Sequence, residues 1–439
     1  MKLTKYKLGD VASFEVSNID KKSKDGEKAV RLCNFTDVYS NWAITNSMKN
    51  KFMVASASDS QIERFSLKKG QVAITKDSET RDDIGIPTYI ADDMKDIVLG
   101  YHCALITPDP TKVDGKYLNA YLNSKIAKKY FENNAVGSGM RFSLTLDTIN
   151  DILLYLPSLK EQQEIGTIFS LIDKKITINR EITRNLEALA RQLYDYWFVQ
   201  FDFPDENGRP YRSSGGKMIW NEKLKREIPE GWELKNLPYI ATFTNGIACQ
   251  KFRPSNNDKS LPVIKIKEMH DGITSESELV KSDIPENVKV NNGDILFSWS
   301  ASLEVIIWTG DEGGLNQHIF KVVPKASFNK PFVFYQILDY IKIFQSMAEA
   351  RKTTMGHITQ DHLNQSMIVV PKDNSLLLEF EKHISPFFNQ LILNSKQISD
   401  LKDKRDELMP LLMNGQISFK TKGLNCDLYI LWIEMELVL

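Results

Sequence analysis

A long amphipathic helical pattern occurs twice in the chain, and it restricts the possible folds more than any other feature. The first copy runs from Leu156 to Phe198, and the second follows Pro371. Apolar residues in both copies alternate at spacings of three and four, as in a helix that packs against another helix. The first apolar seam includes Ile182 and Leu189. A run of about 38 helical residues would span roughly 57 Å, so each copy predicts a long rod.

An asparagine interrupts each of the two apolar seams. Asn179 lies in the first seam and Asn394 in the second, and the shift between them is the same as that between Ile165 and Phe380. A buried asparagine costs stability but fixes the register of a coiled coil. We therefore expect the two helices to pack against each other. Two solvent-facing asparagines on unrelated helices are the alternative.

The segments before the two rods also correspond to each other. The stretch "SLTLDTINDILLYLP", ending at Pro157, corresponds to "HITQDHLNQSMIVVP", ending at Pro371. Short β-like runs precede one helical stretch in each half, at Lys116–Asn133 and Lys330–Arg351. We predict an α+β protein with two globular domains joined by two long helices that form an antiparallel coiled coil. Its internal repeat would be a pseudo-two-fold one.

The repeat also predicts the domain boundaries. Between the halves lies a connector dense in Gly, Pro, Ser and charge, and the last residues have no counterpart in the first half. That tail is a subunit-contact strand, a helix that closes on the chain, or the product of an altered reading frame. The expected segments are a first globular domain at 1–157, a first helical region at 158–201, the connector at 202–231, a second globular domain at 232–371, a second helical region at 372–418 and the tail at 419–439.

Composition excludes several classes of protein. The 56 basic and 57 acidic residues give a net charge of −1, so any nucleic-acid site must be a local basic patch. The four cysteines are isolated from one another, which fits a reducing cytosol and argues against zinc or disulfide frameworks. No apolar run has the length of a membrane span or a signal-peptide core. We expect a cytoplasmic protein without a membrane partner.

The sequence lacks the motifs of nucleotide-binding enzymes, amino-methyltransferases and nucleases. It has no phosphate-binding glycine loop with Lys-Ser/Thr, no Asn/Asp-Pro-Pro-aromatic motif of amino-methyltransferases, and no nuclease cluster of carboxylates and lysine. We therefore predict no catalytic residue, no metal site and no cofactor bound by this chain. An enzyme with an unrecognised active site is a further alternative.

Two junction motifs resemble a known family. "LPSLKEQQEI" leads into the first rod, and "PYRSSGGKMIWNEKLKREIPEGWELKNL" leads into the second globular domain. Both resemble the specificity (S) subunits of type I restriction-modification systems, and the resemblance extends from Tyr6 to about Ser418. The second junction departs from the pattern, because leucines at 376–378 replace the pair Glu161 and Gln162.

The resemblance implies a function in DNA recognition. Each target recognition domain would read one half of a split double-stranded DNA site, and the helices would set the spacer and dock two methyltransferase (M) subunits. Restriction (R) subunits would join that complex, while S-adenosylmethionine, ATP and Mg would bind the partner subunits and not this chain. The alternative is a duplicated protein-binding scaffold that dimerises through its coiled coil.

Loops in equivalent places of the two halves supply the candidate DNA contacts. Basic, hydroxyl and amide side chains follow the glycine-turn strands or precede the proline that begins each rod, and such groups bind phosphates and base edges. The alternative is that they are solvated loop residues. The candidates are Lys76, Arg81, Ser138 and Arg141 in the first half, and Ser298, Ser300, Gln317, Arg351, Lys352, Thr353 and Thr354 in the second.

Overall fold

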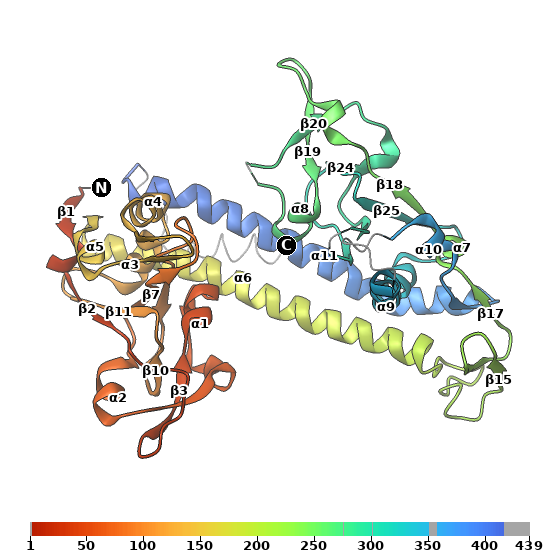
Figure 1. Ribbon diagram of the computed structural model, residues 1–439, viewed down its shortest axis with the longest axis horizontal. Coiled ribbons are helices and arrows are strands. Elements are labelled where there is room, and N and C mark those ends of the chain that lie inside the picture. Colours follow the sequence, from red (N-terminus) through yellow and green to blue (C-terminus); the bar gives the residue numbers. More distant parts are fainter. Residues whose placement is uncertain (1, 275, 301, 351–357, 417–439) are drawn as a thin grey trace, which may run out of the picture. The chain divides into compact units, whose positions relative to one another are not determined.

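The chain divides into two compact units, which are described separately. The computed structural model describes residues 2–274, 276–300, 302–350 and 358–416. Unit 1 comprises Met1–Thr177 with Asp400–Leu439, and unit 2 comprises Ile178–Ser399. Two long helices, α6 (Leu159–Tyr194) and α11 (Ser375–Met413), contribute one part to each unit (Figure 1). Each unit therefore consists of a globular α+β domain and segments of both rods.

Unit 1 is built mainly on two sheets. The strand order of the larger sheet is β2 (Ala12–Val16), β11 (Cys103–Pro108), β7 (Val72–Thr75), β9 (Pro87–Ile90) and β4 (Ala43–Ile44). The second sheet has the order β5 (Met53–Ala57), β3 (Lys28–Cys33), β10 (Met94–Leu99) and β6 (Ser66–Leu67). β1 (Thr4–Lys7) pairs with β14 (Leu153–Leu156). The short helices are α1 (Phe35–Ser40), α2 (Asp59–Phe65), α3 (Gly115–Leu122), α4 (Lys125–Asn134) and α5 (Leu146–Asp151).

The single helix predicted at Lys116–Asn133 is wrong, because this segment forms α3 and α4. The break lies at Asn123 and Ser124, where the Ser124 hydroxyl accepts a hydrogen bond from the amide of Ala127 at 3.3 Å. A serine at this position caps a new helix and does not continue the old one. Both helices are nevertheless amphipathic, which explains why the sequence pattern appears continuous.

Unit 2 repeats the plan of unit 1. Its first sheet has the order β18 (Ala241–Asn245), β25 (Ile319–Pro324), β22 (Ile295–Ser298) and β23 (Glu304–Ile307). Its second sheet has the order β20 (Leu279–Lys281), β19 (Ser260–Ile264), β24 (Gly313–Leu315) and β21 (Lys289–Val290). β17 (Trp232–Lys235) pairs with β26 (Ile368–Pro371), and the connector forms the hairpin β15 (Met218–Asn221) and β16 (Arg226–Pro229). The α-helices of this unit other than the rods are α7 (Leu237–Ile240), α8 (Ile266–Asp271), α9 (Lys330–Ala350) and α10 (Gln360–Asn364).

Equivalent strand pairings confirm the predicted internal repeat. β11 lies between β2 and β7 and is antiparallel to both, and β25 has the same relation to β18 and β22. A terminal antiparallel pair, β1 with β14 or β17 with β26, precedes each rod in the same way. The two halves therefore share one topology although their sequences differ.

A different set of hydrogen bonds ties each rod to its domain, which explains the unusual second junction. In unit 1 the buried Gln162 side chain accepts from the amide of Asp114 at 3.0 Å and donates to two main-chain carbonyls. In unit 2, where a leucine takes the place of the glutamine, the Asn329 side chain donates to the carbonyl of Leu377 at 2.8 Å. Asp114 and Asn329 each cap the helix that follows. Both junctions therefore have a side-chain hydrogen bond between rod and domain, but the side chain belongs to the rod in unit 1 and to the domain in unit 2.

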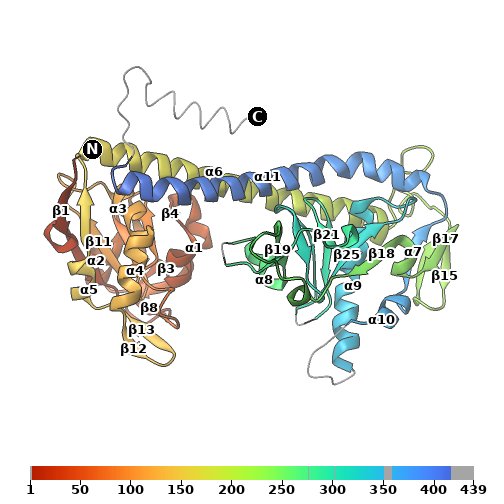
Figure 2. The same cartoon turned by 90° about the horizontal axis from the view of Figure 1, so that it is seen from above.

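The two long helices contact each other in antiparallel orientation, as predicted. Within unit 2, the Asn179 side-chain amide donates to the Gln397 side chain at 3.1 Å. Near the end of α6, the Tyr194 ring lies 6.4 Å from that of Phe380, close to the start of α11. Residue numbers therefore rise along one helix as they fall along the other. Figure 2 shows the two helices side by side in this unit.

The inward-facing side of α6 differs from the predicted seam in its second half. Asn179, Ala190 and Tyr194 are buried, whereas Ile182 and Leu189 are 41% and 49% exposed. An α-helix drifts relative to a strict heptad repeat, so residues that continue a three-four spacing along the sequence can leave the contact line. Part of the apolar surface of α6 consequently faces outward in unit 2.

Candidate nucleic-acid interface

Strand pairing brings two predicted segments of unit 1 together. β12 (Val136–Ser138) and β13 (Arg141–Ser143) form a hairpin, and β13 also pairs with β8 (Asp77–Ser78), which follows β7. Figure 2 shows this small sheet at one edge of the domain. Met140, at the tip of the hairpin, is 86% exposed. Side chains far apart in the sequence thus form one accessible surface.

Three basic side chains of this surface gather around the carboxylate of Asp77. The Lys76 ammonium lies 2.9 Å from Oδ1 of Asp77, and Nδ1 of His102 lies 2.5 Å from Oδ2. Nη2 of Arg141 lies 3.3 Å from Nδ1 of His102 and 3.9 Å from Asp77. The Ser143 hydroxyl donates a further hydrogen bond to Asp77. We name Lys76, Asp77, His102 and Arg141 the strand-end cluster.

The other two predicted residues of unit 1 contact the same small sheet, Ser138 as part of β12 and Arg81 from the loop after β8. Ser138 is exposed and pairs with Arg141 across the β12–β13 hairpin. The guanidinium of Arg81 lies over the ring of Phe142, 5.1 Å from its centre, which is a cation–π geometry. The structure therefore brings Lys76, Arg81, Ser138 and Arg141 together.

The strand-end cluster keeps its carboxylate charged. Burial alone would raise the pKa of Asp77, but hydrogen bonds from Ser143, His102 and Lys76 lower this pKa below its ordinary value. Sequence reasoning did not single out Asp77 or His102, because each contacts the other residues only through strand pairing. The only local indication of Asp77 was Lys76, its neighbour in the sequence.

The backbone of His102 has an unusual conformation. Its φ of +72° lies in the left-handed region, which residues other than glycine rarely adopt. Such a conformation persists where surrounding contacts fix it, and it occurs preferentially at functional sites. Here the bond from the ring to Asp77 and the main-chain bond from Lys76 supply these contacts.

Unit 2 has the same main-chain framework at the equivalent place. In unit 1 the amide of Lys76 donates to the carbonyl of His102 at 2.8 Å, and in unit 2 the amide of Trp299 donates to that of His318 at 3.2 Å. The carbonyl of Lys76 accepts a hydrogen bond from the amide of Leu144 at 2.8 Å. In the same way, the carbonyl of Trp299 accepts a hydrogen bond from the amide of Ile358 at 3.0 Å. Lys76 therefore corresponds to Trp299, and His102 to His318.

The side chains of the second site are mostly neutral. Nε1 of Trp299 donates to the Asn245 side chain at 2.9 Å, and the Trp299 ring lies 5.4 Å from that of His318. Nε2 of the predicted residue Gln317 lies 3.3 Å from Nε2 of His318. Amides can bind base edges and an indole can stack on a base. Sequence reasoning missed Trp299, which follows β22, and Asn245, which ends β18.

Two predicted contacts of unit 2 are buried. Ser298 is fully buried, and its hydroxyl donates to the carbonyl of Ser302 and accepts from the amide of Glu304 at 3.1 Å. Ser300 is 6% exposed. Ser298 ends β22 and Ser300 follows it, so the burial of both side chains gives no support to their predicted role in DNA contact. Arg351, Lys352, Thr353 and Thr354 lie outside the described residues.

The two asparagines of the rods are both buried in unit 2. Asn179 donates to Gln397, while Oδ1 of Asn394 accepts from Gln390 on the same helix at 2.7 Å. Nδ2 of Asn394 is buried without a hydrogen-bond partner among the described residues. The asparagines therefore share the interior of the helix pair, and Asn179 uses Gln397 as its partner.

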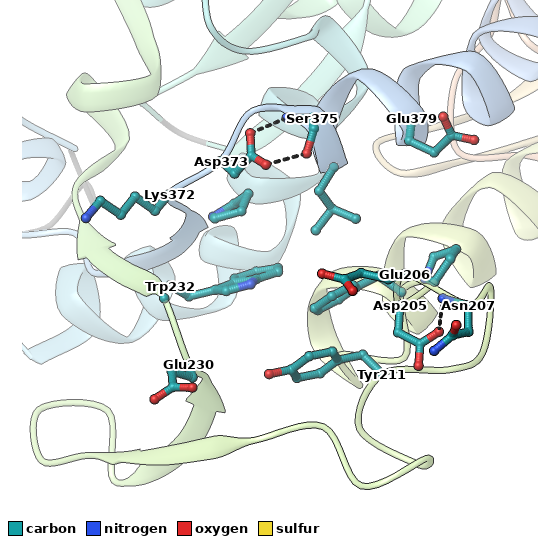
Figure 3. Close-up of a pocket in the computed structure, with 15 residues that line it drawn as sticks. Asp205, Glu206, Asn207, Tyr211, Glu230, Trp232, Lys372, Asp373, Ser375 and Glu379 are labelled. Atoms are coloured by element: carbon teal, nitrogen blue, oxygen red, sulfur yellow. Dashed lines mark hydrogen bonds between the residues drawn. The ribbon is translucent and has the colours of Figure 1, made fainter.

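A pocket of about 1190 Å³ lies in unit 2, between the connector and the start of α11 (Figure 3). Phe203 stacks on Tyr211 at 4.7 Å and on Trp232 at 5.4 Å, and these rings form one wall. Five carboxylates and a single lysine also line it, and phosphates are repelled by such a lining. The pocket is therefore not part of the candidate DNA surface. Its charged lining residues are Asp205, Glu206, Glu230, Asp373, Glu379 and Lys372.

Cys33, Cys103 and Cys249 are buried free thiols, and burial raises the pKa of Cys249 to about 11, so it stays protonated. Within residues 2–274, 276–300, 302–350 and 358–416, no group of three or more His, Cys, Asp or Glu could hold a metal ion. Over the same ranges, no helix is both long and apolar enough to cross a membrane.

Comparisons with known proteins agree with this arrangement of two similar domains and two helices. The family described as "Type I restriction modification DNA specificity domain" matches residues 2–188 and 229–403. The MjaIX specificity subunit of Methanocaldococcus jannaschii is 26% identical over 319 residues, which cover 70% of this chain and 69% of that protein. The HindI specificity subunit of Haemophilus influenzae is 23% identical over 405 residues, covering 80% and 87%.

A solved structure has the same fold. The crystal structure of a type I restriction-modification S subunit from M. genitalium superimposes with a TM-score of 0.57 at 13% identity, covering 94% of this chain and 96% of that one. The family match over both halves of the chain defines a DNA-specificity protein. The chain belongs to the family of type I restriction-modification specificity subunits. It is the non-catalytic DNA specificity component of such a system.

Proposed function

We propose that the globular domain of each unit reads one half of a bipartite double-stranded DNA site. The observation that carries this proposal is the repeated framework that places Lys76 and Trp299 at equivalent strand ends. The first site, with Lys76, Arg81, Ser138 and Arg141, offers cations for phosphates and guanine edges. The second, with Gln317, Trp299 and Asn245, offers amides and an aromatic ring.

We further propose that the two long helices determine the spacer between the half-sites. Their antiparallel contact would fix the separation of the two reading domains, and Asn179 and Asn394 would fix the register. A buried polar group in a helix interface favours one alignment over the others. The bond from Asn179 to Gln397 supports this role.

The outward-facing apolar stripe of α6 supports docking of the methyltransferase subunits. Ile178, Ile182 and Leu189 lie on one face of the helix at heptad-like spacing, and each is at least 40% exposed. Such a stripe needs another helix to cover it. Two M subunits would bind the rods, and R subunits would join through them. S-adenosylmethionine, ATP and Mg would be held by those partners, in the cytoplasm.

The scaffold alternative makes a different prediction about DNA. A protein-binding scaffold would show no base preference, whereas the proposed subunit should bind one split sequence tightly and lose affinity steeply as salt rises. The experiment is a competition assay on the chain co-purified with its methyltransferase partner, with the target defined by methylation mapping. Equal binding to all duplexes, or a methylated sequence without two halves, would exclude the proposal.

The substitution Arg141→Ala should weaken binding to the mapped site. Loss of a bidentate contact from an arginine to guanine typically costs about 1–3 kcal/mol and relaxes the preference at that base pair. The measurement is the dissociation constant for the target and for each single base-pair change in one half-site. Arg212→Ala, an exposed arginine of the connector, is the control and should leave both values unchanged. If Arg141→Ala still discriminates fully between the target and the changed half-sites, Arg141 does not contact the bases.

A further inference from the structure

We propose that Asp77 is a positioning residue of the first reading site, where it holds Lys76, His102 and Arg141 in one orientation toward DNA. The inference rests on the proposed function, because it concerns how the same site distinguishes sequences. Asp77 would act on DNA binding only indirectly, because its own negative charge opposes it. Next to phosphates, a negative side chain lowers affinity.

The geometry shows a carboxylate that is saturated by basic and hydroxyl groups. Both oxygens of Asp77 are engaged: Oδ1 with Lys76 and Ser143, and Oδ2 with His102 and, at 3.9 Å, with Arg141. The Asp77 side chain is only 10% exposed, whereas that of Arg141 is 63% exposed. The acid therefore lies beneath the surface, and the guanidinium that it orients lies above it.

This arrangement would favour selective DNA binding by holding the basic side chains in place before DNA binds. Long basic side chains lose rotamer freedom when they bind, and this loss lowers affinity and blurs selectivity. A charged, nearly buried anchor restricts Lys76 and Arg141 before DNA arrives. The left-handed backbone at His102 (φ +72°) is a second sign that this place is held in a particular conformation.

Unit 2 shows that the fold itself does not require the carboxylate. The position equivalent to Asp77 is that of Ser300, because it follows Trp299, the counterpart of Lys76. The same pair of main-chain hydrogen bonds forms there, to His318 and from Ile358. The strand ends thus adopt one framework with or without an aspartate, so the acid is best explained by the basic residues that it gathers.

The test compares Asp77→Asn with Asp82→Asn in the complex with the methyltransferase subunits. Asp82 is an exposed acid of the neighbouring loop, so both variants remove one negative charge from the same region. The probes are the mapped duplex and two duplexes in which one half-site or the other is scrambled. The thermal midpoint of each complex is recorded alongside the dissociation constants.

If Asp77 positions the cluster, Asp77→Asn should bind scrambled DNA at least as tightly as wild type but lose roughly tenfold in discrimination of one half-site. Its discrimination of the other half-site should remain, and Asp82→Asn should keep both. Full discrimination of both half-sites by Asp77→Asn would overturn the proposal. A wild-type complex without any preference would instead refute the proposed function, so the two failures are distinguishable.

A second variant decides the matter if Asp77→Asn lowers the thermal midpoint. Asp77→Glu keeps the charge but displaces the carboxylate by one methylene. It should leave affinity for scrambled DNA and its salt dependence unchanged while reducing discrimination of the same half-site. Unimpaired discrimination in Asp77→Glu, with Asp77→Asn unfolded, would show that the acid only stabilises the fold and would overturn the proposal.

Discussion

Lengthening both long helices is expected to move the two half-sites apart without changing either of them. Four residues inserted after Thr177 and four after Ser399 would extend α6 and α11 at the places where the two units divide. Helical residues rise about 1.5 Å each, so the insertion adds roughly 6 Å, which is one to two base pairs of DNA. Methylation mapping should show the original half-sites with a longer spacer and no methylation of the original target.

The insertion has two informative controls. Four residues inserted only after Thr177 would lengthen α6 but not α11, so the two helices could not keep their register on both sides of the insertion, and assembly should be impaired. Four residues inserted after Asn207, in an exposed turn of the connector, should leave the spacer unchanged. Altered half-sites after the double insertion, or an unaltered spacer, would show that the helices do not measure the DNA.

Charging the outer stripe of α6 is expected to abolish methylation by separating this subunit from its methyltransferase partner. The double substitution Ile182→Glu with Leu189→Glu places two carboxylates on an apolar surface. Desolvating them in an interface would cost several kcal/mol, whereas exposed substitutions usually change folding stability by only about 0.5 kcal/mol. Co-purification and methylation of the mapped site measure the effect, and the thermal midpoint of the isolated chain measures folding.

Ile343→Glu provides the matched control for this surface. Ile343 lies on α9 in unit 2 and is as exposed as the stripe residues, so its substitution tests for a general effect of added charge. We expect that variant to co-purify and to methylate normally. If Ile182→Glu with Leu189→Glu still forms an active complex, the methyltransferase subunits dock elsewhere.

The sequence predicted those parts of the fold that depend on local periodicity or repetition. The alternation of apolar residues identified both rods, and the matched prolines Pro157 and Pro371 placed their starts. The break between α3 and α4 was missed because the segments on both sides of Ser124 are helix-forming. Ile182 and Leu189 were assigned to the seam because the three-four spacing continues through them, although the drift of a straight helix carries them outward.

The sequence predicted which regions form the candidate site, but not which side chains contact one another within it. Lys76 and Arg141 were identified because both belong to polar loops with equivalents in the other half. Asp77 and His102 were not, because strand pairing alone brings them to these residues. Ser298 resembles a loop residue in the sequence, yet it ends a buried strand. Its hydroxyl bonds to main-chain groups of the residues that follow and does not face solvent. Burial depends on neighbours that the local sequence does not identify.

The main-chain bonds shared by the two strand ends have an evolutionary consequence. Lysine at 76 and tryptophan at 299 occupy one framework whose hydrogen bonds involve only backbone atoms. Substitution of these side chains consequently leaves the supporting architecture intact. If each domain reads one half-site as proposed, point mutations at a few strand ends would retarget one half-site while the other half-site and the spacer are inherited unchanged.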